Sequence, residues 1–170
     1  GYRGRDGYVR PMSVAFTREE DLEATAADLA DRPISPHPNL VTAEGLAQIE
    51  AELASARAAY AAAQIKGSIE SDRTAMARAT RDLRYWSARR ASAQLVEPGE
   101  ADGRVRFGGS VRIERDDGRS QTWRIVGEDE ADPAKGSVSH VSPLARAVLG
   151  RRIGDEVVVA GRTVEITAVG

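Results

Sequence analysis

Two stretches of regularly spaced apolar residues, joined by a Gly-Ser pair, constrain the fold of this chain most. Between residues 42 and 67, apolar or small residues recur at alternating intervals of three and four, which is typical of a coiled-coil seam. The members of this first seam are Leu46, Ile49, Leu53, Ala56, Tyr60 and Ala63. After Gly67 and Ser68 the same intervals resume at Ile69, Asp72, Met76, Ala79, Leu83, Trp86, Arg90 and Ala93. The pattern predicts two helices that form an antiparallel hairpin, with arms about 37 Å long and the turn at 67–72 at the distal end.

The residues after Pro98 and Gly99 change to short alternating runs separated by turn residues, which predict strands. The expected strands are Val105 to Phe107, Val111 to Glu114, Thr122 to Val126, Glu156 to Val159 and Val164 to Val169. Asp116-Asp117-Gly118 predicts a hairpin turn, and Ser142-Pro143 predicts the start of one short helix that ends at Gly150. We therefore expect an α+β chain, in which an N-terminal antiparallel α-helical coiled-coil hairpin precedes a small β-sheet domain with one helix.

The residues before the hairpin form a distinct segment. The sequence from Thr17 to Glu20 is a capping box, which predicts a short helix over about 18–31. Pro33, Pro36 and Pro38 predict a stiff linker after it. The expected domains are thus an N-terminal extension over 1–40, the hairpin over 41–97 and the sheet domain over 98–170, and the role of residues 12–40 is left open.

Charge and composition exclude several classes of protein. The 24 basic and 26 acidic residues give a net charge of -2, which argues against a strongly cationic protein that coats nucleic acid. With no Cys, the chain has no disulfide framework, thiol nucleophile or Cys-ligated zinc. No run approaches the roughly 20 apolar residues of a membrane helix. We expect a cytoplasmic monomer that has no membrane partner.

Several ordered motifs resemble a known family. G-R-V-R-F-G from Gly103, W-R-I-V-G-E-D-E-A-D from Trp123, V-S-P-L-A-R-A-V-L-G from Val141 and R-I-G-D-E-V-V-V from Arg152 are similar to the C-terminal domain of the bacterial Gre transcript cleavage factors. V-T-A-E-G-L at 41–46 and S-A-Q-L-V at 92–96 resemble the start and end of the coiled-coil domain of that family. The chain is identified as a member of the Gre family.

The resemblance implies a fold and a mechanism. Gre factors dock an FKBP-like C-terminal domain on the rim of the secondary channel of RNA polymerase, and pass the hairpin toward the active centre and the 3′ end of the nascent RNA. Two carboxylates at the hairpin tip help to hold a second magnesium ion and to position a water, so that the polymerase itself cleaves backtracked RNA. A Gre factor is accordingly no enzyme but an accessory of the polymerase.

The hairpin tip departs from the family pattern. In G-S-I-E-S-D, Ser68 and Ser71 stand at the two expected carboxylate positions, and Glu70 and Asp72 could replace them in positioning magnesium. Residues two apart lie about 200° apart on a helix, so joint coordination requires a non-helical turn. Alternatively, Ser68 caps the second helix and the acidic residues complement its dipole.

The hairpin also looks shorter than that of the family, by about one heptad per arm, or roughly 10 Å of reach. Two functions therefore stay open. The chain is either an elongation factor that stimulates cleavage of backtracked RNA, or a non-cleaving regulator that occupies the secondary channel and competes with Gre factors. A stand-alone peptide-binding or isomerase domain is a weaker hypothesis, because it leaves the hairpin unexplained.

Two surfaces are candidates for contact with the polymerase. By resemblance, the acidic loop (Glu128, Asp129, Glu130 and Asp132) and the Ser142-Pro143 segment belong to the docking surface. Charge reversal at Asp129 and Asp132 is expected to weaken binding and to leave the fold intact. The alternatives are an ordinary polar loop and an ordinary helix start.

The second arm carries six arginines, of which Arg73, Arg78 and Arg81 are the candidates for contact with RNA or the channel wall. The alternative is a solvated flank of the coiled coil, with Arg84, Arg89 and Arg90 as its other basic members. Tyr85 and Trp86 are expected to pack at the base of the hairpin, and His140 is expected to be structural.

Overall fold

The computed structural model describes residues 29–65 and 69–170, and the side chains of 29–65 and 73–170. Contacts group the chain into two units, which are described separately. The helical unit holds the residues up to Ile34 together with Glu52–Ala88, and the sheet unit holds Ser35–Ala51 together with Arg89–Gly170. This grouping cuts both long helices, whereas the domains expected from the sequence divide the chain before and after the hairpin.

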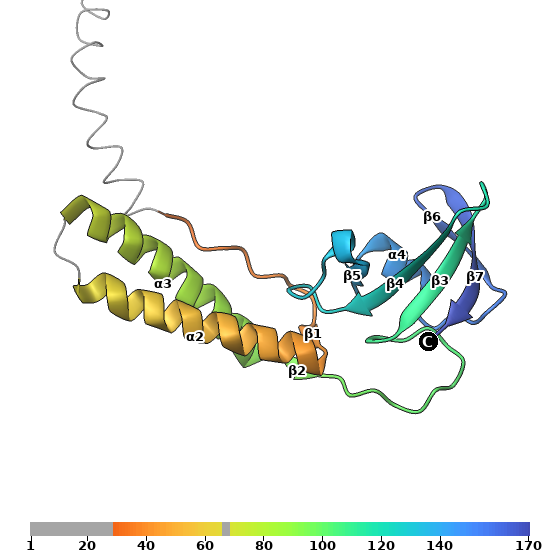
Figure 1. The fold of residues 1–170 in the computed structure, drawn as a ribbon, viewed down its shortest axis with the longest axis horizontal. Helices are drawn as coiled ribbons and strands as arrows, with labels where there is room; N and C mark the ends of the chain where they lie inside the picture. Colours follow the sequence, from red (N-terminus) through yellow and green to blue (C-terminus); the bar gives the residue numbers. More distant parts are fainter. Residues whose placement is uncertain (1–28, 66–68) are drawn as a thin grey trace, which may run out of the picture. The chain divides into compact units, whose positions relative to one another are not determined.

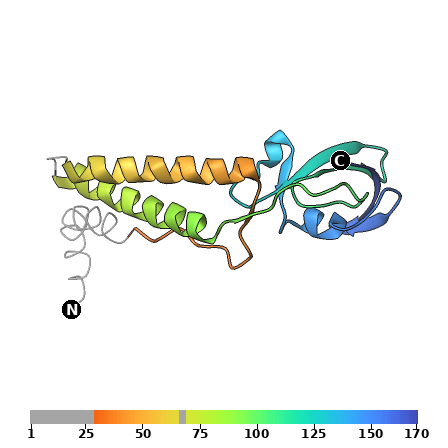
Figure 2. The ribbon, with the colours of Figure 1, turned by 90° about the horizontal axis from the view of Figure 1, so that it is seen from below.

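Two long helices form the hairpin, as the seam predicts (Figures 1 and 2). They are α2 (Ala43–Ile65) and α3 (Ile69–Ser92). In the helical unit, the seam residues Leu53, Ala56 and Ala63 of α2 are buried, as are Ala79 and Trp86 of α3. Small alanines at most of these positions bury little apolar area, because the hydrophobic effect scales with the surface removed from water.

The seam changes its interval near the end of α3, which corrects the prediction for Arg90. Arg90 is exposed and pairs with Glu50, with 3.0 Å between Nε and Oε2. The buried residue is Arg89, which follows Trp86 by three positions instead of four. Both intervals keep a residue on the same helix face, so the partners around the helix decide which arginine is buried.

The sheet unit contains a curled five-stranded sheet with the order β5-β4-β3-β7-β6 (Figure 1). Its strands are β3 (Ser110–Arg115), β4 (Ser120–Val126), β5 (Ser137–Ser139), β6 (Glu156–Val159) and β7 (Arg162–Val169). Neighbouring strands are antiparallel, except that β4 and β5 are parallel. The core is aliphatic and includes Ile113, Ile125 and Ile166, each with no exposed surface. The predicted α+β class is therefore confirmed.

Two local predictions are confirmed in this unit. Helix α4 (Pro143–Val148) begins at Ser142, whose Oγ accepts a hydrogen bond from the amide of Ala145 at 3.2 Å. The turn between β3 and β4 closes with Gly118 in the left-handed region at φ 85°, a conformation that glycine adopts without a steric cost.

The strand predicted over Val105 to Phe107 is wrong. Val105 is buried in the core, but its amide donates to the carbonyl of Arg151 and its carbonyl accepts from Gly150, which belong to a loop. One isolated bridge, between Arg104 and Arg152, is all the pairing that this segment has. The apolar residues of this segment resemble a strand in the sequence because Val105 is buried, although the segment does not pair with a strand of the sheet.

Two short pairings escaped the sequence prediction. Strand β5 lies at the sheet edge, and β1 (Leu40–Val41) pairs in parallel with β2 (Gln94–Leu95). The β1–β2 pair joins the two ends of the hairpin, just before α2 and just after α3. Runs of two or three residues carry no readable alternation, which explains why they were missed.

The helix predicted over about 18–31 lies outside the described residues except for residues 29–31, which are not helical. Residues 30–38 have no regular secondary structure apart from a bend at Pro36 and His37, as the prolines predict. In the part of the chain that the structure describes, none of the helices has the length and apolar character to cross a membrane.

Candidate functional site

The base of the hairpin is organised around Arg89, in the last turn of α3. Its Nε donates to Oδ2 of Asp129 at 2.6 Å, and its Nη2 donates to Oδ1 of Asn39 at 2.8 Å. Oε2 of Glu128 lies 4.0 Å from the same Nη2. Only 2% of the Arg89 side chain and 8% of the Asp129 side chain are exposed. We call Asn39, Arg89, Glu128 and Asp129 the base cluster.

Asn39 connects the base cluster to the segment that precedes α2. Its Nδ2 donates to the carbonyl of Arg89 at 2.8 Å and to Oγ of Ser92 at 3.1 Å. The amide side chain therefore satisfies both the guanidinium and one of the last carbonyls of α3, which have no partner within the helix.

A second group of contacts fixes the start of α2. The hydroxyl of Thr42 accepts a hydrogen bond from the amide of Gly45 at 2.9 Å, which caps the helix, and it donates to Oε1 of Glu130 at 2.6 Å. A Cβ at Gly45 would lie 2.6 Å from Oε1 of Glu130, so a larger residue here would displace the end of the Glu130 side chain. A glycine in the first turn of a helix, which costs stability in isolation, is thus explained by the approach of the loop.

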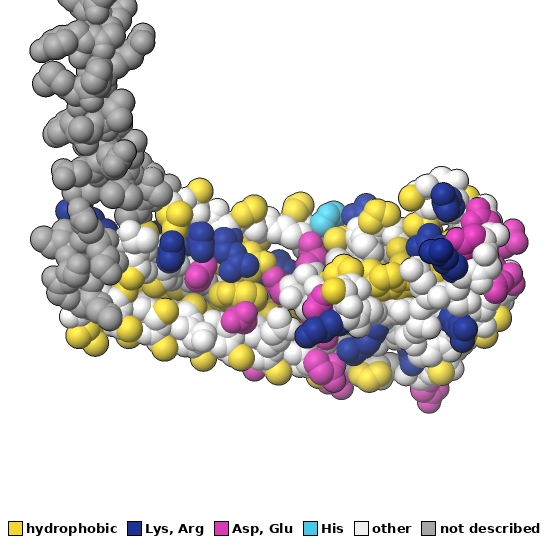
Figure 3. All heavy atoms as spheres, turned by 45° about the horizontal axis from the view of Figure 1, so that its top comes forward, with side chains coloured by type: hydrophobic (Ala, Val, Ile, Leu, Met, Phe, Trp, Pro, Cys, Tyr) yellow, Lys and Arg dark blue, Asp and Glu magenta, His cyan; other side chains and the backbone are white. Residues whose placement is uncertain are grey.

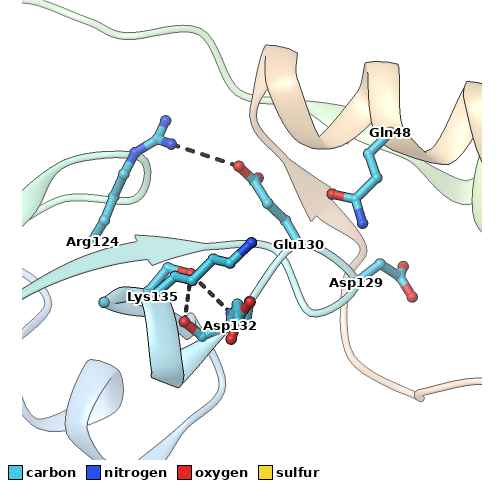
Figure 4. Close-up of a pocket in the computed structure, with 9 residues that line it drawn as sticks. Gln48, Arg124, Asp129, Glu130, Asp132 and Lys135 are labelled. Carbon is cyan, nitrogen blue, oxygen red and sulfur yellow. Dashed lines mark hydrogen bonds and ion pairs between the residues drawn. The ribbon is translucent and has the colours of Figure 1, made fainter.

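Arg124 of β4 completes this second group (Figure 4). Its Nη1 lies 3.6 Å from Oε2 of Glu130, and its Nη2 donates to Oε1 of Glu44 at 3.2 Å. The pKa of Glu44 is lowered, first by a backbone hydrogen bond at the helix start and then by Arg124. Acidic residues in the first turn are also favoured by the helix dipole.

These contacts change the interpretation of the acidic loop. Asp129 and Glu130 point to basic and hydroxyl partners of their own unit, and Glu128 faces Arg89. Asp132 is half-buried, and its carboxylate has no ion-pair partner among the described residues. Charge reversal at Asp129 would place a cation against the buried Arg89, so the expectation that it leaves the fold intact does not fit its burial.

Asp132 lines a groove of about 490 Å³ (Figure 4). Gln48, Arg124, Glu130 and Lys135 also line it, so that its walls carry both signs of charge. Among the four carboxylates of the acidic loop, that of Asp132 has no ion pair with a described residue. Ser142 and Pro143 form an ordinary helix start, as described above, and their polymerase contact stays a prediction.

The magnesium prediction for the tip is not tested. Ser68 lies outside the described residues, and so do the side chains of Glu70 and Asp72. The backbone at both positions belongs to α3, where residues two apart lie about 200° apart around the axis. Among the side chains that are described, no group of three or more His, Asp and Glu could hold a metal ion.

The arginines of α3 fall into different environments. Arg73 and Arg78 are exposed, whereas Arg81 is half-buried and its Nε donates to Oδ1 of Asp82 at 3.2 Å. Figure 3 shows basic side chains gathered on one face of the helical unit. Arg89 does not belong to this exposed group, because it is buried in the base cluster. The contact of Arg73, Arg78 and Arg81 with RNA or a channel wall stays a prediction.

Residues 29–34, which we call the strap, contact α3 within the helical unit. Asp31 accepts a hydrogen bond from Nη1 of Arg84 at 3.2 Å, and Nη1 of Arg32 lies 3.7 Å from Oδ1 of Asp82. The Arg32 guanidinium also lies over the Tyr85 ring, 3.8 Å from its centroid. Exposed ion pairs contribute about 0–1 kcal/mol each, and an exposed cation–π contact about 0.5–1 kcal/mol.

Trp86 and His140 are buried, which agrees with the expected packing roles, whereas Tyr85 is half-buried. The rings of Tyr85 and Trp86 meet edge to face, with centroids 4.9 Å apart. His140 is buried against Phe107, and desolvation lowers its pKa, which keeps the imidazole neutral at pH 7.

Comparison with known proteins identifies the family. The family model described as "Transcription elongation factor, GreA/GreB, C-term" matches residues 91–170. The GreA factor of Desulfovibrio desulfuricans is 37% identical over 149 residues, which cover 86% of this chain and 82% of that protein. The chain belongs to the GreA/GreB family. The GreB factor of Neisseria meningitidis serogroup B is 48% identical over 80 residues, which are 46% of this chain but only 49% of that protein.

Solved structures give weaker similarity. The GreA factor homologue of Thermus thermophilus is 19% identical, with a TM-score of 0.37 over 79% of this chain and 99% of that one. A GreA/GreB elongation factor from Nitrosomonas europaea is 18% identical, with a TM-score of 0.36 over 78% of this chain and 98% of that one. The family assignment rests on the sequence relatives.

Sequence reasoning missed the base cluster, although part of the signal was present. Arg89 satisfies the helical period as well as Arg90 does, and Glu128 to Glu130 offer acidic partners. The 40 positions that separate Arg89 from Asp129 hide the pairing in a single sequence. Asn39 gave no signal, because it follows a proline in a segment that reads as a linker.

Two neighbouring arginines of α3 provide a matched test of the base cluster. Arg89→Ala should lower the free energy of unfolding by about 3–5 kcal/mol, because it removes the cation that lies 2.6 Å from the buried carboxylate of Asp129. Arg90→Ala should cost at most about 1 kcal/mol, since 45% of Arg90 and 50% of Glu50 are exposed. Urea unfolding followed by circular dichroism measures both. Equal costs for the two variants would contradict the assignment of Arg89.

Proposed function

We propose that this protein is a Gre-like elongation factor that binds RNA polymerase at the secondary channel and stimulates cleavage of backtracked RNA. The observation that carries this proposal is the similarity to a GreA factor over 82% of the length of that protein, which includes the hairpin as well as the sheet domain. In this function the sheet unit docks on the polymerase, and the α2–α3 hairpin enters the channel.

The chemistry belongs to the polymerase. A second magnesium ion would activate the attacking water and offset the charge that develops on the phosphate. Magnesium keeps most of its waters and is commonly held by one or two carboxylates. Positions 70 and 72 lie on different sides of a helical turn, so they fit one carboxylate contact better than a joint one. We infer that Glu70 or Asp72 supports the ion singly, and that the other orients water or neighbouring groups.

The residues at the hairpin tip also support a second function. With serines at 68 and 71 and a helical backbone from Ile69, the tip departs from the carboxylate pair that the family resemblance implies. A hairpin that enters the channel without positioning an ion would exclude other factors from it. In this alternative the protein is a non-cleaving regulator that competes with GreA and GreB factors.

Release of RNA 3′ fragments from a stalled, backtracked elongation complex separates the two functions. With magnesium, the protein should accelerate release, and Glu70→Gln combined with Asp72→Asn should reduce the acceleration at least tenfold, roughly the effect of weakening support for a bound metal. Glu97→Gln combined with Glu100→Gln removes the same charge from exposed residues and should have no effect.

Three outcomes of this assay would count against parts of the proposal. If the unchanged protein does not accelerate release but suppresses cleavage by an added GreA factor, the protein is the non-cleaving competitor. If acceleration survives the double substitution, Glu70 and Asp72 are not the residues that support the ion. If the protein neither accelerates nor suppresses cleavage, it does not act at the channel.

Docking through the acidic loop is tested best at Asp132. Asp132→Lys should weaken binding to core polymerase about tenfold, or about 1.4 kcal/mol, and most of the change should lie in the association rate. The unfolding midpoint should stay unchanged, because Asp132 has no ion-pair partner among the described residues. The control is Asp116→Lys, at an exposed position of the β3–β4 turn. Equal binding of the two variants would exclude Asp132 from the docking surface.

A further inference from the structure

The strap makes reciprocal contacts with one stretch of α3. Asp31 of the strap pairs with Arg84 of the helix, and Arg32 of the strap pairs with Asp82 of the helix. The charge changes from negative to positive between the adjacent strap residues Asp31 and Arg32. A shift of the strap by one residue along the helix would therefore place like charges together. The strap therefore has one favoured register on the helix.

Two side chains of the helix, Asp82 and Tyr85, form the binding site of Arg32, which we call the seat. Asp82 and Tyr85 are three residues apart and so lie on the same helix face. The guanidinium of Arg32 contacts this carboxylate and the face of this ring at the same time, and it lies 5.3 Å from the centroid of the Trp86 ring. Arginine can stack its planar guanidinium on an aromatic ring and at the same time bind a carboxylate with its N–H groups. Lysine cannot make both contacts in this way.

The sequence of the strap favours this seated conformation. Pro33 directly follows Arg32, and a residue before proline is restricted to extended backbone. Because the free strap already avoids helical conformations at Arg32, it loses less conformational freedom when it binds. A short Asp-Arg-Pro segment thus suits an open helix face.

The contacts between the strap and the helix are also easily broken. The four side chains of the two ion pairs are 36% to 67% exposed, so water and salt compete with each contact. Because the strap belongs to the same chain as α3, it rebinds at a high effective concentration after release. These properties describe a reversible cover of the helix.

We propose that the α3 face formed by Asp82, Arg84 and Tyr85 is an interaction surface that the strap occupies in the free protein, and that RNA polymerase displaces the strap when the hairpin enters the channel. This inference rests on the proposed function. The same arm carries Arg78 and Arg81, the predicted channel contacts, within about one helical turn of Asp82. An additional segment on this arm widens the hairpin, so strap binding and insertion exclude each other.

The first experiment measures the strap without polymerase. The chain has no Cys and two Trp, so a nitroxide on Ala30→Cys is a single probe, and the indole signal of Trp86 reports its approach by NMR. We expect the label to broaden the Trp86 signal at low salt, and Arg32→Ala, Asp82→Asn or 0.5 M salt to restore it. Arg57→Ala, which removes an exposed arginine from α2, should leave the broadening unchanged. If the label does not broaden the Trp86 signal under any condition, the strap does not bind this face of α3 in solution.

The second experiment measures binding to core polymerase by the unlabelled full chain. Arg32→Ala and Asp82→Asn release the strap from opposite sides of the contact, so each should bind about three- to tenfold more tightly at low salt. The gain should disappear at 0.5 M salt, where the strap of the unchanged protein is also released. Arg57→Ala should bind as the unchanged protein does.

The two experiments separate this inference from the proposed function. A seated strap in the NMR experiment, combined with equal or weaker polymerase binding by both releasing variants, would overturn the competition and leave the Gre-like function standing. Failure of every variant and of the unchanged protein to bind polymerase would contradict the proposed function. The competition would fall with it, whereas the seat of the strap would still be decided by the NMR result.

Discussion

The buried ion pair between Arg89 and Asp129 is the contact around which the base of the hairpin is arranged. Removing Arg89 and Asp129 from water is costly, and the cost is offset only where geometry and further hydrogen bonds satisfy both groups. Here the guanidinium has Asp129 on one side and Asn39 on the other, and the same asparagine binds the last turn of α3. The cluster thereby holds together three segments that are distant in the sequence: the segment before α2, the end of α3 and the acidic loop.

This arrangement changes how the acidic loop acts. By composition the loop looks like a free charged surface, but Asp129 and Glu130 contact residues at the base of the hairpin, and Glu130 lies close to Gly45. Asp132 and the groove beside it remain open to a partner. The loop thus combines residues that contact the base of the hairpin with a residue that does not, so a substitution at Asp129 or Glu130 would change stability and would not isolate the proposed docking contact.

The sequence predicted the larger elements because their signals are periodic or local. The heptad seam identified α2 and α3, and Ser142-Pro143 and Gly118 identified a helix start and a turn. The errors occurred where tertiary contacts decide. Arg89 and Arg90 are equally compatible with the helical period, and only Asn39 and Asp129 determine which one is buried. Val105 reads as a strand residue because it is apolar, although its hydrogen bonds go to a loop. Of the candidate site, sequence and family resemblance named the acidic loop and the arginines of α3, but neither indicated that part of each is used internally.

A double-mutant cycle on Arg89 and Asp129 tests the central claim most directly. The free energies of unfolding of Arg89→Met, Asp129→Leu, the double variant and the unchanged protein give the coupling between the two side chains. The account predicts a coupling of about 2–3 kcal/mol, with the double variant more stable than the sum of the single effects implies, because an apolar pair replaces a buried charge that has lost its nearest counter-ion. Single effects that add to within about 0.5 kcal/mol would show that the two residues do not act together, and would contradict the account.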